Sequence, residues 1–151
     1  MVFSLAYHFL QDRSLAEDVT QEVFLQLYRE QDPLSTEEHT RYWLRKVASH
    51  RCIDAARRRK HRPRVTLEEI GEPAARESFH DPILSETLRK LIATLPETPR
   101  MIVVLRYQED MDPSEIADTL GVPLATVKSH LHRSLAKLRE KMQRLNKETV
   151  G

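Results

Sequence analysis

The sequence predicts an all-α protein, and three observations support this fold class. Apolar residues recur every three or four positions in several segments, which is the spacing of one helix face. Only 3 of the 151 residues are glycine, too few for the many tight turns of a β-rich fold. Helix start and stop signals also flank the periodic segments, as at Asp112-Pro113 and Gly121. We therefore expect two small helical domains, residues 1–62 and 84–147, joined by a flexible linker, residues 63–83.

Three helices are expected in the first half of the chain. Residues 3–10 are mainly apolar and form the first. Residues 15–30 form the second, and Ser14 with Glu17 three positions later makes a capping box at its start. Residues 40–60 form the third, which ends in a basic run. Its apolar stripe consists of Leu44, Val47, Ala48, Cys52 and Ala55.

The segments that follow are a linker and a second helical half. Residues 63–83 combine prolines, a glycine and many acidic residues with few apolar ones, which is typical of a linker. A helical pattern resumes at Leu84. Residues 101–105, Met-Ile-Val-Val-Leu, fit a buried strand by pattern alone. Because their neighbours are helical, we expect a buried helix at 98–108 instead.

Charge is distributed unevenly along the chain, although the formal net charge is only +1. Residues 41–64 hold ten basic residues and one acidic residue, and residues 126–147 hold seven and one. Acidic stretches precede and separate these two segments. Two separate basic surfaces suggest two contacts with a polyanion. Two solvated helix faces would give the same pattern, so charge alone leaves both interpretations open.

Composition argues against several other classes of protein. The single cysteine, Cys52, excludes an internal disulfide framework and a multi-cysteine zinc site. The sequence has no glycine-rich phosphate loop, no apolar run of membrane-spanning length and no basic signal-peptide start. No catalytic triad or carboxylate pair stands out. We expect a cytoplasmic protein that is not an enzyme, uses no cofactor or metal and does not insert into a membrane.

The strongest pattern lies at residues 112–138. A helix of about eight residues, a turn at Gly121 and a longer helix after Pro123 are typical of a helix-turn-helix. The longer helix turns its apolar face inward, so its other face presents side chains suited to major-groove edges and phosphates. These side chains are Thr126, Lys128, Ser129, His130, His132 and Arg133. The alternative is a plain helical hairpin with a charged face.

The chain also resembles a known family at two separate places. The segment that begins Glu115-Ile-Ala-Asp-Thr-Leu-Gly-Val-Pro resembles region 4 of the bacterial sigma-70 family. Ala16-Glu-Asp-Val-Thr-Gln-Glu resembles regions 2.1–2.2, and Tyr42-Trp-Leu-Arg-Lys-Val-Ala is similar to regions 2.3–2.4. The similarity is greatest to the extracytoplasmic-function (ECF) group, whose members have only the second and fourth sigma domains.

The resemblance implies an RNA polymerase sigma factor, which gives the core enzyme its choice of promoter. In the family, the region 2.2 helix binds the clamp coiled coil of the largest core subunit. The corresponding residues here are Asp18, Gln21, Glu22, Phe24 and Leu25. An anti-sigma factor is a common further partner in the family and usually clamps between the two domains.

The resemblance also implies two contacts with promoter DNA. Regions 2.3–2.4 read the −10 element and hold a flipped base, which requires an aromatic platform, hydrogen-bond donors and cations. These roles correspond to Trp43, Lys46, His50, Arg51 and Arg57. Taken alone, Trp43 fits a core position better. Region 4 would read the −35 element through the face of the second helix that begins at Thr126 and ends at Arg133.

This sequence departs from the family pattern at three places. His50 stands where the family usually has asparagine, and His130 and His132 stand where arginine is common. Most members also have a further helix before the position of Phe3. Two alternative functions therefore stay open. One is a stand-alone helix-turn-helix regulator of the LuxR type, and the other is a truncated sigma-like module that titrates core polymerase or an anti-sigma factor.

Overall fold

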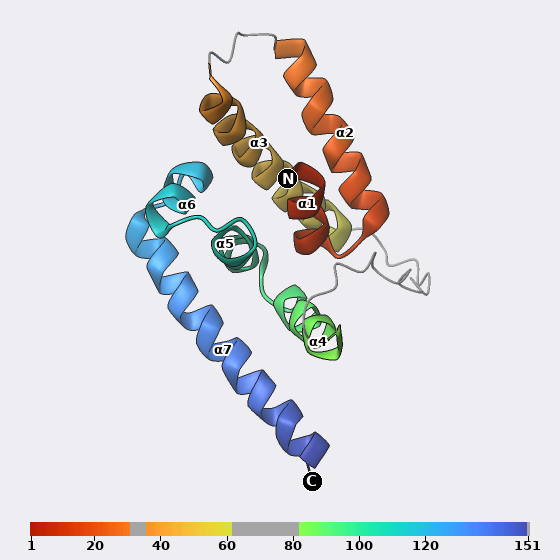
Figure 1. Cartoon of the computed structure of the whole chain (residues 1–151), viewed down its shortest axis with the longest axis vertical. Coiled ribbons are helices and arrows are strands. Elements are labelled where there is room, and N and C mark those ends of the chain that lie inside the picture. The colour runs from red at the N-terminus through yellow and green to blue at the C-terminus, as the bar shows by residue number, and fades with distance from the viewer. Residues whose placement is uncertain (31–35, 62–81, 151) are drawn as a thin grey trace.

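The computed structural model describes residues 1–30, 36–61 and 82–150. Within these ranges the chain forms seven helices and no strand, which confirms the predicted all-α class (Figure 1). The helices are α1 (Val2–Leu10), α2 (Arg13–Glu30), α3 (Glu37–His61), α4 (Pro82–Ala93), α5 (Glu97–Tyr107), α6 (Pro113–Leu120) and α7 (Leu124–Val150). The predicted linker, 63–83, lies outside the described residues except for its last two positions, which begin α4.

The first three helices pack together as a three-helix bundle. α2 and α3 run side by side, and α1 packs against both of them (Figure 1). Leu5 and Phe9 of α1 are fully buried in the same cluster as Val23 of α2 and Cys52 of α3. These are the apolar positions that helical spacing selects, so the pattern in the sequence correctly predicts the buried side of each helix.

α2 begins at a different cap from the predicted one. The backbone N–H of Leu15 donates to Oδ1 of Asp12 at 3.0 Å, so Asp12 caps the helix. Ser14 lies exposed inside the first turn, and Glu17 pairs with Arg13 at 3.3 Å. The predicted Ser14–Glu17 capping box is therefore wrong. Asp and Ser are both good caps, and local sequence does not decide between two candidates that are two positions apart.

α5 lies at the centre of the molecule. It packs against α1 and α3 on one side and against α4, α6 and α7 on the other. All five residues from Met101 to Leu105 are buried. Neighbouring helices therefore cover this segment all round, which explains why it lacks an amphipathic pattern. The expectation of a buried helix here, rather than a buried strand, is confirmed.

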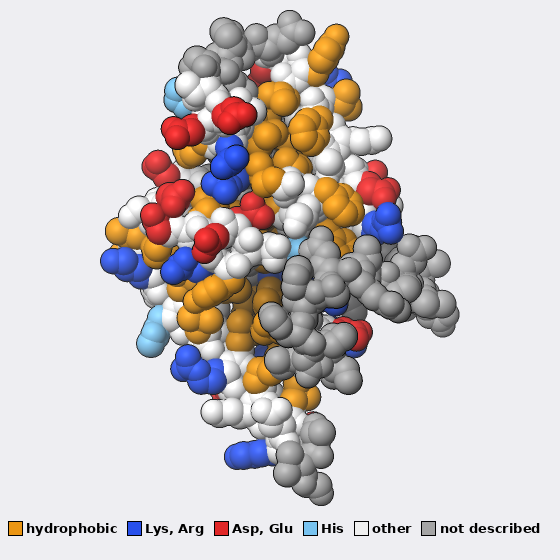
Figure 2. Space-filling view, viewed as in Figure 1, with side chains coloured by type: hydrophobic (Ala, Val, Ile, Leu, Met, Phe, Trp, Pro, Cys, Tyr) orange, Lys and Arg blue, Asp and Glu red, His pale blue; other side chains and the backbone are white. Residues whose placement is uncertain are grey.

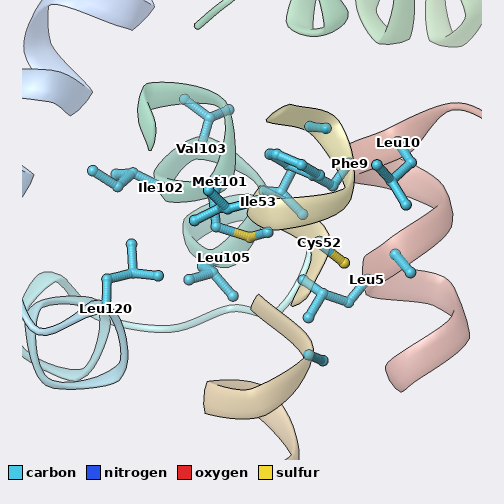
Figure 3. Packing of buried hydrophobic residues seen from close by; sticks show 14 of the residues in the cluster. Leu5, Phe9, Leu10, Cys52, Ile53, Met101, Ile102, Val103, Leu105 and Leu120 are labelled. Carbon is cyan, nitrogen blue, oxygen red and sulfur yellow. The ribbon is translucent and has the colours of Figure 1, made fainter. Parts of the chain in front are cut away.

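Helices from both halves of the chain share one hydrophobic core. Leu5, Phe9 and Cys52 come from the first half, and Met101, Ile102 and Leu105 come from α5 (Figure 3). The predicted pair of separately folded domains joined by a linker does not by itself anticipate this continuous packing. In the structure, α5 contacts α1 and α3, and α6 contacts α3.

Polar contacts also join the two halves. Arg100 of α5 donates to the backbone oxygen of Phe9 at 3.2 Å, and its guanidinium carbon lies 4.8 Å from the centre of the Phe9 ring. Lys60 of α3 pairs with Glu97 at 3.1 Å. Arg45 of α3 approaches Glu109 at 3.8 Å, where burial raises the pKa of the Glu109 carboxyl and Arg45 opposes the rise. The interface between the halves thus includes charges whose hydration is reduced.

Candidate nucleic-acid interface

The α6–α7 pair has the local geometry of a helix-turn-helix. Asp112 accepts a hydrogen bond from the N–H of Glu115 at 2.9 Å, and the Glu115 carboxylate accepts one from the N–H of Asp112 at 3.3 Å. Pro113 occupies the first turn, where its missing N–H leaves no intrahelical bond unmade. Gly121 ends α6 with a φ of 68°, a conformation that glycine adopts without strain. The predicted cap, proline and C-terminal glycine are all confirmed.

The angle between α6 and α7 is set by a small apolar core. Ile116 and Val127 are fully buried, and Leu120 and Leu131 are nearly so. The N–H of Val122 donates to the carbonyl of Ala117 at 3.1 Å, which closes the turn after Gly121. The opposite side of α7 is consequently directed away from the core. This arrangement gives the second helix a free face at its N-terminal end.

The free face of α7 carries the side chains that the sequence predicts for duplex DNA. Lys128, Ser129, His132 and Arg133 are exposed. Thr126 and His130 are half-buried, so their access is more restricted. Burial, and then the nearby Arg133, lowers the pKa of the His130 imidazole. The imidazolium form of His130 is therefore disfavoured, and the fixed positive charge on this face comes from Lys128 and Arg133.

α3 is covered on several sides and open along one stripe. Cys52 faces the core beside α1, and Arg45 faces Glu109 in the segment before α6. The stripe that remains open contains the predicted residues Lys46, His50 and Arg57, all of them exposed. These positions are spaced by four and then seven residues, so they lie on one helix face. The structure thus brings three of the five predicted −10 residues together.

The other two predicted −10 residues differ from this pattern. Trp43 is half-buried and packs against the hydrophobic core, so only part of its ring is accessible. Arg51 is turned toward α2, where its guanidinium donates to Gln26 Oε1 at 2.6 and 3.0 Å and to Glu22 Oε2 at 3.0 Å. Sequence spacing did not reveal this orientation, because it depends on where α2 packs.

Tyr42 is a candidate that sequence reasoning missed. Its side chain is exposed, and the ammonium group of Lys46 lies 6.0 Å from the centre of its ring. An exposed aromatic ring next to a cation suits a stacked base and its phosphate. Tyr42 also lies within 3.5 Å of the Asp118 carbonyl through its hydroxyl. Its position next to Trp43 was the available signal.

α2 presents a mixed polar and apolar surface on the side opposite the core. Asp18, Gln21, Phe24 and Leu25 are exposed, and Glu22 is half-buried. Tyr28, one turn beyond Phe24, is 73% exposed and extends this surface. Figure 2 shows hydrophobic side chains on the surface of the half of the molecule where α2 and α3 lie, and others over the opposite half. Exposed aromatic and aliphatic side chains next to carboxylates are typical of a protein-binding surface.

Comparison with known proteins finds a matching family model for each half of the chain. A family model described as Sigma-70 region 2 matches residues 1–62, and one described as Sigma-70, region 4 matches residues 85–138. The chain is 30% identical over 128 residues to the RNA polymerase sigma-E factor of Streptomyces avermitilis, covering 85% of this chain and 71% of that protein. This chain belongs to the ECF group of the sigma-70 family.

Other ECF sigma factors show similar relationships. The chain is 27% identical to SigW of Bacillus subtilis, covering 95% of this chain and 84% of that protein. It is 32% identical to SigE of Mycolicibacterium smegmatis, covering 99% of this chain and 60% of that protein. The chain therefore spans less than two thirds of the length of that SigE.

The matched regions coincide with the surfaces described above. The region 2 match contains α1–α3, with the open stripe of α3 and the exposed surface of α2. The region 4 match contains the helix-turn-helix of this ECF family member. Among the described residues, no group of three or more metal-ligating side chains lies together. None of the described helices is long and apolar enough to cross a membrane.

Proposed function

We propose that this chain directs core RNA polymerase to specific promoters and supports initiation as an ECF sigma factor. The observation that carries the proposal is that one chain presents two separate, exposed basic helix faces, on α3 and on α7. A stand-alone regulator needs only the second face. In this proposal, no bond is made or broken by the protein, and promoter opening is driven by binding energy.

The face of α7 reads the −35 element in this proposal. Lys128 and Arg133 are exposed cations that reach phosphates or guanine edges, and Ser129 is a short donor and acceptor. The N-terminal half of α7 enters the major groove, as the second helix of a helix-turn-helix does. Thr126, His130 and His132 complete the contact surface.

The open stripe of α3 binds the −10 element. Lys46 and Arg57 neutralise the DNA backbone, and His50 donates to or accepts from a base edge. Tyr42 and the accessible part of Trp43 supply aromatic surface for an unstacked base of the non-template strand. Single-strand capture at this stripe stabilises the melted promoter.

The outer surface of α2 binds the core enzyme, with the clamp of the largest subunit as the partner. Asp18 and Glu22 attract a basic surface, and Phe24 and Leu25 supply apolar area at its centre. An anti-sigma factor that covers these surfaces would regulate them. In this proposal the protein acts on core polymerase in the cytoplasm.

Substitutions on one surface at a time test the assignment of α7 to the −35 element and of α3 to the −10 element. The double variant Lys128→Ala/Arg133→Ala should weaken −35 duplex binding by about 1–3 kcal/mol per base contact, with core affinity unchanged. Lys46→Ala/Arg57→Ala should weaken binding to single-stranded −10 DNA by the core–sigma complex. Arg144→Ala is the matched control. This basic residue lies roughly 17 Å beyond Arg133 along α7, and it pairs with Glu140.

Two results would contradict the proposal. If the −35 double variant used promoters as the unmodified chain does, α7 would not be the recognition helix. If the chain bound duplex DNA with full affinity without core enzyme, and core never increased that affinity, the stand-alone regulator would be the better interpretation.

A further inference from the structure

Arg51 of α3 bridges to α2 through its side chain. Its Nη1 donates to Glu22 Oε2 at 3.0 Å, and its Nε and Nη2 both donate to Gln26 Oε1 at 3.0 and 2.6 Å. Gln26 in turn donates through Nε2 to Glu30 Oε1 at 3.1 Å. A continuous chain of hydrogen bonds therefore runs from Glu22 to Glu30 along the side of α2 that faces α3.

This geometry is poorly suited to a DNA-reading role for Arg51. One residue further along a helix is turned by about 100°, so Arg51 points away from the stripe that contains His50. All three guanidinium nitrogens already donate to α2. Its neighbours on the open stripe, Lys46 and Arg57, have no such partners within the described residues and stay exposed.

The same geometry fixes two side chains next to the exposed surface of α2. The guanidinium fork determines where the Gln26 amide and the Glu22 carboxylate lie. Arg51 donates to only one Glu22 oxygen, and within the described part of the chain Oε1 accepts no hydrogen bond. Glu22 is thus held in one conformation while retaining an oxygen for a donor on another protein.

We propose that Arg51 is a positioning residue for polymerase binding, which holds Glu22 and Gln26 in the conformation that core RNA polymerase recognises. The inference rests on the proposed function, in which α2 binds the core enzyme. Side chains that are already ordered lose less conformational freedom when a partner binds. Lysine would keep the charge at this position but not the fork that reaches both residues.

Affinity for purified core polymerase, measured with full-length chain variants, tests the proposal. We expect Arg51→Ala and Arg51→Lys each to weaken core binding about three- to tenfold, or about 0.7–1.4 kcal/mol. Arg58→Ala is the matched control, because Arg58 is an exposed arginine on the same helix, and it should bind core as the unmodified chain does. Thermal melting of each variant shows whether it is folded at the assay temperature.

A double-mutant cycle separates positioning from a general structural role. In a Glu22→Ala/Gln26→Ala background, Arg51→Ala should cost no further core affinity, because the residues it positions are gone. If Arg51→Ala destabilises the chain, Arg51→Lys carries the same test with the charge retained.

Four outcomes would overturn the proposal, and they differ from one another. Additive losses in the cycle would mean that Arg51 acts independently of Glu22 and Gln26. Unchanged core affinity with weakened −10 single-strand binding would make Arg51 a DNA contact after all. No core binding by the unmodified chain would reject the proposed function itself, whereas core binding that is insensitive to Glu22→Ala would reject only the assignment of this surface.

Discussion

At the scale of single residues, the surroundings of a side chain decide what chemistry it has. His130 and His132 are separated by one position on α7, yet His130 is half-buried and His132 is exposed. Burial and the proximity of Arg133 both disfavour the imidazolium form of His130 and lower its pKa. The exposed face of α7 therefore has a neighbouring imidazole whose charged form is disfavoured and is gained in acid.

This titration should make −35 binding depend on pH. Because DNA attracts the protonated form, affinity for a −35 duplex should rise as pH falls through and below the ordinary histidine range near about 6.5. His130→Gln removes the titrating group while keeping a polar side chain, so part of the rise should disappear. Fluorescence anisotropy between pH 7.5 and 5.5 measures it. Identical pH profiles for the two proteins would show that His130 lies away from the DNA.

Cys52 is fully buried, in contrast to the exposed His132. The side chain is 0% exposed, and burial raises its pKa to about 12. The thiolate is the reactive form of cysteine, so the folded protein should react with a thiol reagent at pH 8 only as fast as it unfolds. Reaction followed by mass spectrometry, with and without denaturant, checks this. Rapid labelling of the native protein would mean that the packing between α1 and α3 is open.

At the scale of helices, α6 is the element whose limits follow most directly from the sequence. Asp112 caps the N–H of Glu115 three residues on, and the N–H of Gly121 donates to the carbonyl of Ala117 four residues back, so each end signal acts through local sequence. The start of α2 was mispredicted because Asp12 and Ser14 are both suitable caps. The orientation of Arg51 was not predictable either, because it depends on the packing of α2 against α3.

The capping box of α6 should have a measurable effect on stability. Asp112→Ala removes the acceptor for the N–H of Glu115, and losing such a cap costs about 0.5–2 kcal/mol. We expect the free energy of unfolding to fall by that amount in urea denaturation. Ser114→Ala is a nearby control, because Ser114 is exposed in the first turn of the same helix and is not the capping residue. Equal effects of the two substitutions would contradict the role of the cap.

At the scale of the whole molecule, helix periodicity predicts which residues are buried but not that both halves share one core. Leu5, Phe9 and Met101 were each recognisable as apolar positions, and the pairing of α1 with α5 depends on contacts about 90 residues apart in the sequence. The open faces of α3 and α7 also depend on long-range packing, since each is the side that no other described helix covers.

Substitution of Arg100 tests the packing of the two halves of the chain against each other. It donates to the carbonyls of Phe9 and Leu95, and both would lose a donor in Arg100→Ala. Leaving buried carbonyls unpaired costs about 1–3 kcal/mol, so the free energy of unfolding should fall by this order. Arg139→Ala, an exposed arginine on α7, is the control. If Arg100→Ala were as stable as the control, the two halves would not be held together by this contact in solution.

Run-off transcription is the most direct test of the central claim that this chain is a promoter-specific sigma factor. The assay combines purified chain, bacterial core polymerase and a library of promoter-like duplexes. We expect defined transcripts only when the chain is present, and their start sites should reveal two sequence elements upstream. Folded chain that yields no transcript would contradict the claim. Core binding without initiation would then indicate a titrating module, and duplex binding without core would indicate a stand-alone regulator.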